Sequence, residues 1–521
     1  MGITRRNFVK TGAVCAAGVM AAGQGQESPP PSGRPNILVI MTDQHSKHFL
    51  GCEGNELVRT PHLDRLASEG VRFENAYCPA PLCVPSRMSF MTGRYPSGNR
   101  VWNNNAILNA GIPTWAHALG RAGYETSLIG RMHFMGPDQR HGFENRPIGE
   151  YSAGWPGVAW KCDVPIRAPY YHGGSGQSRP DVMEAGRGRT TYQYMDEQIV
   201  DAACGYLEDH AEGSGRPFAA VVGLVLPHCP YIAPKEIFNY YYERIDVPDT
   251  DKDLAPAVKQ FQRSRKIATP LTTKQIRVAR AAYYGLCEYV DHLIGRVLTT
   301  LEETGFAEDT LVVYCSDHGE MAGEHGCWWK SIYYEGSAGV PLIVRWPGVT
   351  PAGAICGHVS NLVDLAPTLI EVAGAPELPA TDGRSLAPSL RGNPRPDSSD
   401  ETFSELCDHR GGHVPSRMIR SGKWKLWQCL GEEGLPPVLF DLEQDPGEHH
   451  DLGRNPAMAG VRDRLLNRLL EDWSPQHVRE GSRQNWEDFA ALAQWGKKMQ
   501  PYCPDRMKVP PPSHEAEVEL L

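Results

Sequence analysis

Apolar residues along this chain follow two patterns, short unbroken runs and longer stretches in which they recur with helical spacing. Unbroken runs are typical of strands buried on both faces of a sheet. They occupy residues 36–41, 127–129, 218–226, 311–315 and 341–344. Helical spacing predicts helices at residues 60–67, 112–121, 274–303 and 362–373. Thr60 and Pro61 suit the start of the first helix, and Gly70 suits its end.

Predicted strands and helices alternate along most of the chain. This order predicts an α/β fold, in which a large and mostly parallel sheet is sandwiched by helices. With 521 residues, the chain is long enough for one large domain and a smaller one. We expect the large domain at residues 33–390.

Composition changes between about residues 375 and 400, where Pro, Ser, Asp and Gly are frequent. Short alternating strands are predicted beyond this segment at 416–428 and 438–442, and a helix at 458–473. These elements predict a smaller C-terminal α+β subdomain at residues 391–480.

The end of the chain is polar and rich in proline from about Gln476 onward. Such a composition offers little apolar surface for packing. We therefore expect residues 481–521 to form a wrapping tail or a partly disordered segment.

Residues 1–32 have the features of an export signal followed by a linker. Arg5 and Arg6 precede an apolar, small-residue stretch at 11–23, and residues 24–35 are rich in Pro, Ser and Gly. A helix needs about 20 apolar residues to span a bilayer, and this stretch is shorter. We therefore expect no stable membrane anchor. The paired arginines resemble a twin-arginine signal, with a generic secretory peptide as the alternative. We expect a periplasmic or extracellular protein.

Charge and cysteine content narrow the class of protein further. The net charge of −10 gives no reason to expect nucleic acid as a partner, because phosphate binding needs a basic face. The 14 cysteines include no CxxC pair and no Cys/His spacing typical of zinc sites. An exported protein can form disulfides, but their pairing cannot be deduced from one sequence. Cys287 and Cys315 stand in apolar patterns that suit buried free thiols.

One cysteine-containing motif is the most specific chemical feature of the sequence. Cys83 opens the string CVPSR, and TGR follows at residues 92–94. Pro85 and Ser86 suit a turn that begins a helix, which would place Cys83 near a helix N-terminus, where anions are favoured. A structural cysteine before such a turn is the alternative interpretation.

Polar pairs directly follow two of the predicted strands. Asp43 and Gln44 follow the strand at 36–41, and Asp317 and His318 follow the strand at 311–315. In open α/β sheets, ligands bind beyond the carboxyl ends of the strands. Two carboxylates with an amide and an imidazole make a plausible divalent cation site. Taken alone, either pair could be a cap or a surface turn.

Together these motifs resemble the formylglycine-dependent sulfatases, which belong to the alkaline-phosphatase-like superfamily. The resemblance runs from about Pro35 to Leu452 and is closest to choline-sulfatase-like members in the strings at 130–144 and 316–342. It implies that a maturation enzyme oxidises Cys83 to formylglycine. We expect this step before export, because the modification should require an unfolded segment. One hydroxyl of the aldehyde hydrate then attacks sulfur and expels the alcohol, and the other releases sulfate by reforming the aldehyde. The implied activity is hydrolysis of sulfate esters.

The resemblance also implies a metal site. Asp43, Asp317 and the modified Cys83 are ligands, and we add Gln44 and His318 to the set. Many sulfatases have a second Asp in place of Gln44 and Asn in place of His318. Fewer carboxylates and an imidazole weaken the preference for a hard ion such as calcium. We still place calcium first, with manganese or magnesium open.

Five further side chains receive roles from the resemblance. Arg131 and Lys330 bind the sulfate, and Arg87 holds the hydrate and screens its charge. His133 assists the proton movements of the hydrate, and His228 protonates the leaving oxygen. Most relatives have Lys at position 131, and the planar fork of Arg can change the geometry of sulfate binding. A buried structural His or a solvated Lys or Arg is the ordinary alternative for each residue alone.

The sequence leaves the substrate open. An export signal suits a sulfated carbohydrate or another external sulfate ester, and we favour these over choline sulfate. Choline would need an aromatic cage for its quaternary ammonium. The candidate cage residues are Trp102, Trp155, Trp160, Trp328 and Trp329. Two rival functions remain, a phosphate or phosphonate ester hydrolase of the same superfamily and a catalytically inactive binder of sulfate or glycans.

Overall fold

The computed structural model describes residues 33–521 of the chain with several gaps. The gaps are 151–153, 159–176, 214, 249–252, 394–399, 409–411, 431–434, 506 and 508–517. The expected export signal and the candidate cage residue Trp160 lie outside the described residues. Among the helices that are described, none is both long enough and apolar enough to cross a membrane.

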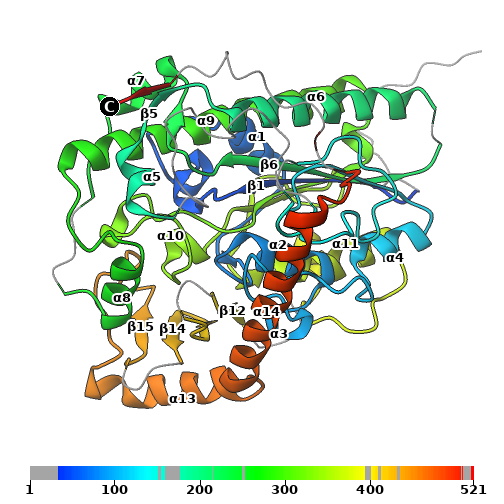
Figure 1. The fold of residues 1–521 in the computed structure, drawn as a ribbon. Helices are drawn as coiled ribbons and strands as arrows, with labels where there is room; N and C mark the ends of the chain where they lie inside the picture. Colours follow the sequence, from blue (N-terminus) through cyan, green and yellow to red (C-terminus); the bar gives the residue numbers. More distant parts are fainter. Residues whose placement is uncertain are drawn as a thin grey trace, which may run out of the picture.

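A seven-stranded sheet runs through the centre of the molecule in the order β10-β2-β9-β8-β1-β6-β4 (Figure 1). Neighbouring strands pair in parallel except at β9, which is antiparallel to β8 and β2. The strands are β1 (Asn36–Asp43), β2 (Val71–Phe73), β4 (Glu125–Gly130), β6 (Phe218–Pro227), β8 (Thr310–Ser316), β9 (Leu342–Arg345) and β10 (Ala354–Cys356). The expected mostly parallel α/β sheet is confirmed.

The register of the central strands places their carboxyl ends side by side. Asp43 at the end of β1 pairs with Pro227 at the end of β6. On the other side of β1, Thr42 pairs with Ser316 at the end of β8. The residues that follow these three strands therefore gather at one edge of the sheet.

Helices cover both faces of this sheet (Figure 1). One face packs against α1 (Pro61–Glu69), α6 (Thr191–Ala211) and α9 (Thr273–Glu303), and the other against α2 (Cys83–Thr92), α4 (Trp115–Arg121) and α11 (Leu365–Ala373). Helix α4 begins later than the predicted residue 112, because Thr114 and His117 form a capping box at its start.

A smaller α+β subdomain follows, as the sequence predicted. Its four-stranded antiparallel sheet has the order β12-β13-β14-β15, and α13 packs against it. The elements are β12 (Glu401–Leu406), β13 (Ser416–Ser421), β14 (Trp424–Cys429), β15 (Val438–Asp441) and α13 (Ala459–Leu470). A 25-residue helix, α14 (Pro475–Met499), then leads back to the main domain, in the region for which we expected a wrapping tail or a partly disordered segment.

The remaining elements are short or lie at the periphery. The strands are β3 (Ala76–Tyr77), β5 (Gly186–Gly188), β7 (Ile232–Ala233), β11 (Ser360–Asn361) and β16 (Val518–Leu520). The helices are α3 (Pro96–Asn99), α5 (Arg179–Met183), α7 (Lys235–Tyr242), α8 (Pro256–Ser264), α10 (Glu335–Ala338) and α12 (Ala387–Leu390).

Candidate active site

A cluster of buried polar side chains occupies the carboxyl edge of the central sheet. It is built from the ends of β1, β4, β6 and β8, the first turns of α2, and the loop before α10. Its predicted members are buried, with His133 only partly so; they are Asp43, Gln44, Cys83, Arg87, Arg131, His133, His228, Asp317, His318 and Lys330. The structure thus places all ten of the predicted catalytic, sulfate-binding and metal-binding residues at one site.

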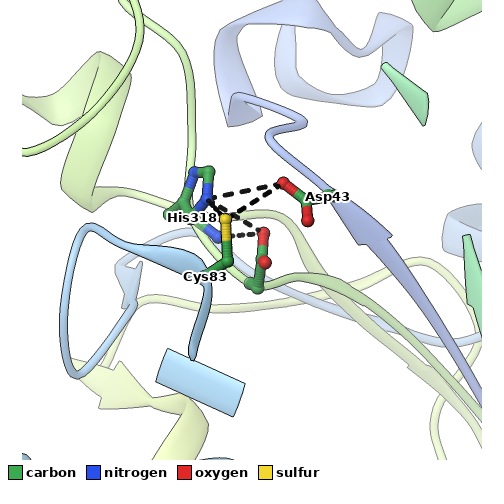
Figure 2. A group of neighbouring side chains, drawn as sticks. Asp43, Cys83 and His318 are labelled. Carbon is green, nitrogen blue, oxygen red and sulfur yellow. Dashed lines mark hydrogen bonds and ion pairs between the residues drawn. The ribbon is translucent and has the colours of Figure 1, made fainter. Parts of the chain in front are cut away.

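Four of these side chains form a candidate cation site (Figure 2). One ligand atom from each of Asp43, Cys83, Asp317 and His318 lies within 4.8 Å of the others. The Nε2 atom of His318 lies 3.5 Å from Asp43 Oδ1 and 3.4 Å from Asp317 Oδ1. Two carboxylates, an imidazole and the group at position 83 are donors that suit one divalent ion.

Cys83 is the first residue of α2, so its side chain stands at a helix N-terminus. Its Sγ lies 3.3 Å from His318 Nε2 and 3.6 Å from Asp43 Oδ1. Burial, together with the negative charge of Asp43, raises the pKa of the Cys83 thiol to about 11. At neutral pH the unmodified residue is therefore a protonated thiol, which is a weak nucleophile.

Arg87 lies one helical turn after Cys83 and binds both aspartates. Its Nε donates to Asp317 Oδ2 at 2.7 Å, and its Nη2 donates to Asp43 Oδ2 at 3.2 Å. The guanidinium is fully buried and gives two further hydrogen bonds to the carbonyls of Thr42 and Arg131. In this geometry, Arg87 orients and neutralises the two carboxylates.

Arg131 follows β4 and bridges two carboxylates. Its Nε donates to Asp43 Oδ2 at 2.9 Å and its Nη1 to Glu150 Oε2 at 2.9 Å, while its Nη2 lies 2.9 Å from His133 Nδ1. Burial alone would raise the pKa of Asp43, but Arg131, Lys330 and other cations outweigh burial and hold it well below its usual value. Asp43 is therefore an anion, the form in which a carboxylate binds a cation.

Lys330 contacts both the candidate nucleophile position and Gln44. Its Nζ donates to Gln44 Oε1 at 2.8 Å, lies 3.1 Å from Cys83 Sγ, and is 3.8 Å from Asp43 Oδ1. Burial lowers the pKa of Lys330, but Cys83, Asp43 and Asp317 outweigh that effect and raise it. The ammonium remains charged beside Cys83.

The predicted proton-transfer histidines are held as neutral rings. Burial, reinforced by Arg131, lowers the pKa of His133 to about 3. Burial and then Lys330 lower the pKa of His228 well below its usual value. His228 Nδ1 lies 2.6 Å from the carbonyl oxygen of Cys229, so Nδ1 carries the hydrogen and Nε2 is the basic atom.

Two buried carboxylates of the site received no role in the sequence analysis. Glu150 accepts from Arg131 and from the backbone N–H of His133. Glu320 accepts from the side chain of Gln44. Glu320 stands inside the string SDHGE, so its position after a strand could have drawn attention to it. Glu150 has no comparable signal in the sequence.

The candidate aromatic cage is not assembled by the described residues. Trp102, Trp328 and Trp329 are almost completely buried within hydrophobic clusters. Trp155 makes an edge contact with Trp495 of α14. These tryptophans therefore serve packing, in agreement with the ordinary interpretation of aromatic residues near a pocket.

Comparison with protein families shows what the chain is similar to. The family model described as "Sulfatase" matches residues 35–375, and the model "N-sulphoglucosamine sulphohydrolase, C-terminal" matches residues 323–474. A choline-sulfatase from Rhizobium meliloti is 36% identical over 488 residues, which cover 88% of this chain and 92% of that protein. Arylsulfatase K from Danio rerio is 28% identical over 459 residues, covering 84% of each chain.

A solved structure has the same fold. The phosphonate monoester hydrolase from Silicibacter pomeroyi superposes with a TM-score of 0.70 and is 27% identical. The match covers 84% of this chain and 94% of that protein.

Proposed function

The chain belongs to the sulfatase family of sulfuric ester hydrolases, and from this premise we propose that it uses a formylglycine made from Cys83 and one divalent cation. The observation that supports this most directly is the position of Cys83. It stands at a helix N-terminus, against Asp43, His318 and Lys330, and its thiol is protonated. When formed and hydrated, the aldehyde supplies one hydroxyl that attacks sulfur and a second through which sulfate is released.

The residues around position 83 would prepare the site for a sulfate ester. Lys330 and the N-terminus of α2 present positive charge where sulfate oxygens gather. Arg131 donates hydrogen bonds from Nε to Asp43 and from Nη1 to Glu150. It would therefore contribute to sulfate binding mostly through its positive charge. We assign to His133, a neutral ring whose Nδ1 accepts from Arg131, the proton movements of the hydrate, and to Nε2 of His228 the exchange of a proton with the leaving oxygen.

The cation would be held by five residues, Asp43, Gln44, the modified Cys83, Asp317 and His318. A divalent ion there lowers the pKa of a bound hydroxyl and neutralises sulfate oxygens. The oxygen-rich donor set favours calcium, and His318 leaves manganese or magnesium open.

Two measurements on protein from its native host test this function. Mass spectrometry of the peptide that spans Cys83 should find an aldehyde in place of the thiol. Cys83→Ala should abolish hydrolysis of an aryl sulfate while the far-ultraviolet circular dichroism stays unchanged, because the side chain is small and buried. An unmodified thiol, or activity retained by the variant, contradicts the proposal. The thiol result would favour an inactive binder.

For the substrate, we propose a sulfated carbohydrate or another sulfate ester outside the cytoplasm. The match of residues 323–474 to a sulphohydrolase C-terminal family supports a sugar substrate. Choline sulfate is the second candidate, supported by the 36% identity to a choline-sulfatase over most of both chains. The burial of Trp102, Trp328 and Trp329 leaves an ammonium cage without three of its candidates. A comparison of kcat/KM across choline sulfate, aryl sulfate and defined sulfated sugars decides between them.

A phosphonate or phosphate ester hydrolase is the remaining alternative. The 27% identity and close superposition with a phosphonate monoester hydrolase favour it. Turnover of an aryl sulfate against an aryl phosphate diester separates the two activities, and a strong preference for the phosphoryl substrate would overturn a sulfatase function.

We also propose export by the twin-arginine route, after Cys83 has been modified in the unfolded chain in the cytoplasm. A route that carries folded protein permits this order of events. Replacement of Arg5 and Arg6 by Lys should leave active, modified enzyme in the cytoplasm. Continued export of the double variant would point to a generic secretory signal.

A further inference from the structure

Glu320 is a buried carboxylate whose two oxygens both receive hydrogen bonds from site-forming loops. Its Oε2 accepts from Gln44 Nε2 at 2.5 Å and from Tyr231 OH at 2.8 Å. Its Oε1 accepts from the backbone N–H of Ala322 at 2.8 Å and of Trp329 at 2.6 Å. Glu320 is only 1% exposed. Four donors converge on one side chain that accepts but cannot donate when ionised.

The contact with Gln44 determines which end of its amide faces the cation site. A carboxamide has one oxygen, which can bind a cation, and one NH₂ group, which cannot. Glu320 takes the NH₂ group, and Lys330 Nζ donates to the oxygen at 2.8 Å. The reversed amide would set an NH₂ group against an ammonium and a carbonyl oxygen against a carboxylate. Glu320 and Lys330 therefore hold the Gln44 amide with its oxygen against Lys330 Nζ, which itself lies 3.1 Å from Cys83 Sγ and 3.8 Å from Asp43 Oδ1.

The backbone around Gln44 is fixed as well. Gln44 has a φ of 70°, its N–H donates to Asp317 Oδ1 at 3.1 Å, and its carbonyl accepts from Tyr283 OH at 2.7 Å. With the backbone anchored, the orientation of the amide is the variable that remains, and it depends on Glu320.

We propose that Glu320 is a positioning residue that makes Gln44 a competent oxygen ligand for the cation. This inference rests on the cation site of the proposed function. An aspartate at position 44 would offer two equivalent oxygens and need no such partner, whereas a glutamine must be oriented. The bonds to Trp329 and Tyr231 extend the same control to the loops that carry Lys330 and His228.

A charge-swap cycle tests the proposal with a readout that does not depend on activity. Calcium and manganese affinity are measured by calorimetric titration of EDTA-stripped protein, together with the rise in melting temperature on adding each ion. Glu320→Gln should weaken binding about 10- to 100-fold, because its amide cannot accept from all four donors. Gln44→Glu should also bind poorly, because two carboxylates would face each other. The double variant Gln44→Glu, Glu320→Gln restores a donor–acceptor pair and should recover affinity.

Glu405→Gln is the matched control. Glu405 is another fully buried carboxylate, and it lies on β12. It accepts from the backbone N–H of Ser97 at 2.9 Å. Its replacement should leave cation affinity unchanged. If Glu320→Gln binds cations like wild type, or if the double variant is no better than the single ones, Glu320 does not orient Gln44. If wild-type protein binds neither ion, the cation site itself is wrong, and this inference falls with it.

Discussion

Lys330 and Cys83 are in direct contact, with Nζ 3.1 Å from Sγ, although 247 positions separate them in the sequence. Both side chains are almost completely buried. An ammonium fixed beside the nucleophile position, in a site without bulk water, stabilises negative charge that develops there during reaction.

Replacement of Lys330 by Met should therefore lower kcat/KM for an aryl sulfate by on the order of 10²- to 10³-fold. Methionine keeps most of the length of the side chain and removes the charged ammonium with its N–H donors. Steady-state kinetics measure the loss, with circular dichroism as a check on folding. A loss below about tenfold would mean that Lys330 is a structural partner of Gln44 rather than part of the sulfate site.

A buried ionic cluster joins the subdomain to the main domain. Lys425 of β14 is fully buried, lies 2.8 Å from Glu335 Oε1 at the start of α10, and also contacts Glu448. Lys425→Met should destabilise the protein by about 3–5 kcal/mol, because two carboxylates lose the cation between them. Guanidinium unfolding measures the change.

Lys423→Met is the matched control for this cluster. Lys423 lies two residues earlier in the chain, and its side chain, which is 34% exposed, pairs with the buried Asp441. Because solvent reaches this lysine, its replacement should move the midpoint of unfolding much less than Lys425→Met does. Equal effects of the two substitutions would contradict the importance of the buried cluster.

The raised pKa of the buried Asp196 carboxyl should make the stability of the protein depend on pH. This carboxylate on α6 accepts from the N–H groups of Val225 and Leu226 at the end of β6, and burial raises its pKa to about 7. Since the folded pKa lies above the unfolded value of about 3.9, the folded state holds the proton more tightly between these values. This group therefore favours folding most below about pH 4, and the contribution is lost as pH rises through about 7.

Asp196→Asn removes this titration. At about 1.4 kcal/mol per pKa unit, the variant should gain up to about 4 kcal/mol relative to wild type between pH 4 and pH 8. Urea unfolding of both proteins at several pH values measures the difference. A constant difference, or one that shrinks with rising pH, would contradict the raised pKa.

Much of the fold follows from local patterns. The run NILVIM at residues 36–41 is apolar at nearly every position and becomes the central strand β1. Helix α14 was not predicted because its packing is tertiary. Its buried residues are Val478, Gly481, Ser482 and Gly496, and among these only Val478 carries a large apolar side chain. Gly481 instead packs against Trp102, which is remote in the sequence.

The site was predictable to the extent that it follows strand ends. Asp43 ends β1 and Asp317 directly follows β8, and the register of these two parallel strands brings the two residues together. The contact of Gln44 with Glu320 spans 276 positions and depends on which way two side chains point. Periodicity does not encode such pairings, so the partners of Glu150 and Glu320 follow from the tertiary structure, even though the string SDHGE marks the place of Glu320.

Removal of the metal should both inactivate and destabilise the protein. Asp43 and Asp317 are completely buried beside each other, and a bound divalent ion would offset their repulsion along with Arg87. EDTA should lower the melting temperature and abolish turnover, and calcium should restore both. A free calcium concentration of 100 times the dissociation constant should stabilise the folded protein by about 2.7 kcal/mol, a change that calorimetry can measure.

His318→Asn tests which ion the site prefers. The imidazole Nε2 of His318 lies 3.4 Å from Asp317 Oδ1 and 3.3 Å from Cys83 Sγ, in the position of a direct ligand. A nitrogen ligand suits manganese, whereas an amide oxygen suits calcium. The variant should therefore shift the ratio of calcium to manganese affinity toward calcium by about tenfold, measured by titration of metal-free protein. An unchanged ratio with weaker binding of both ions would place His318 outside the coordination sphere, as a hydrogen-bonding neighbour of Cys83.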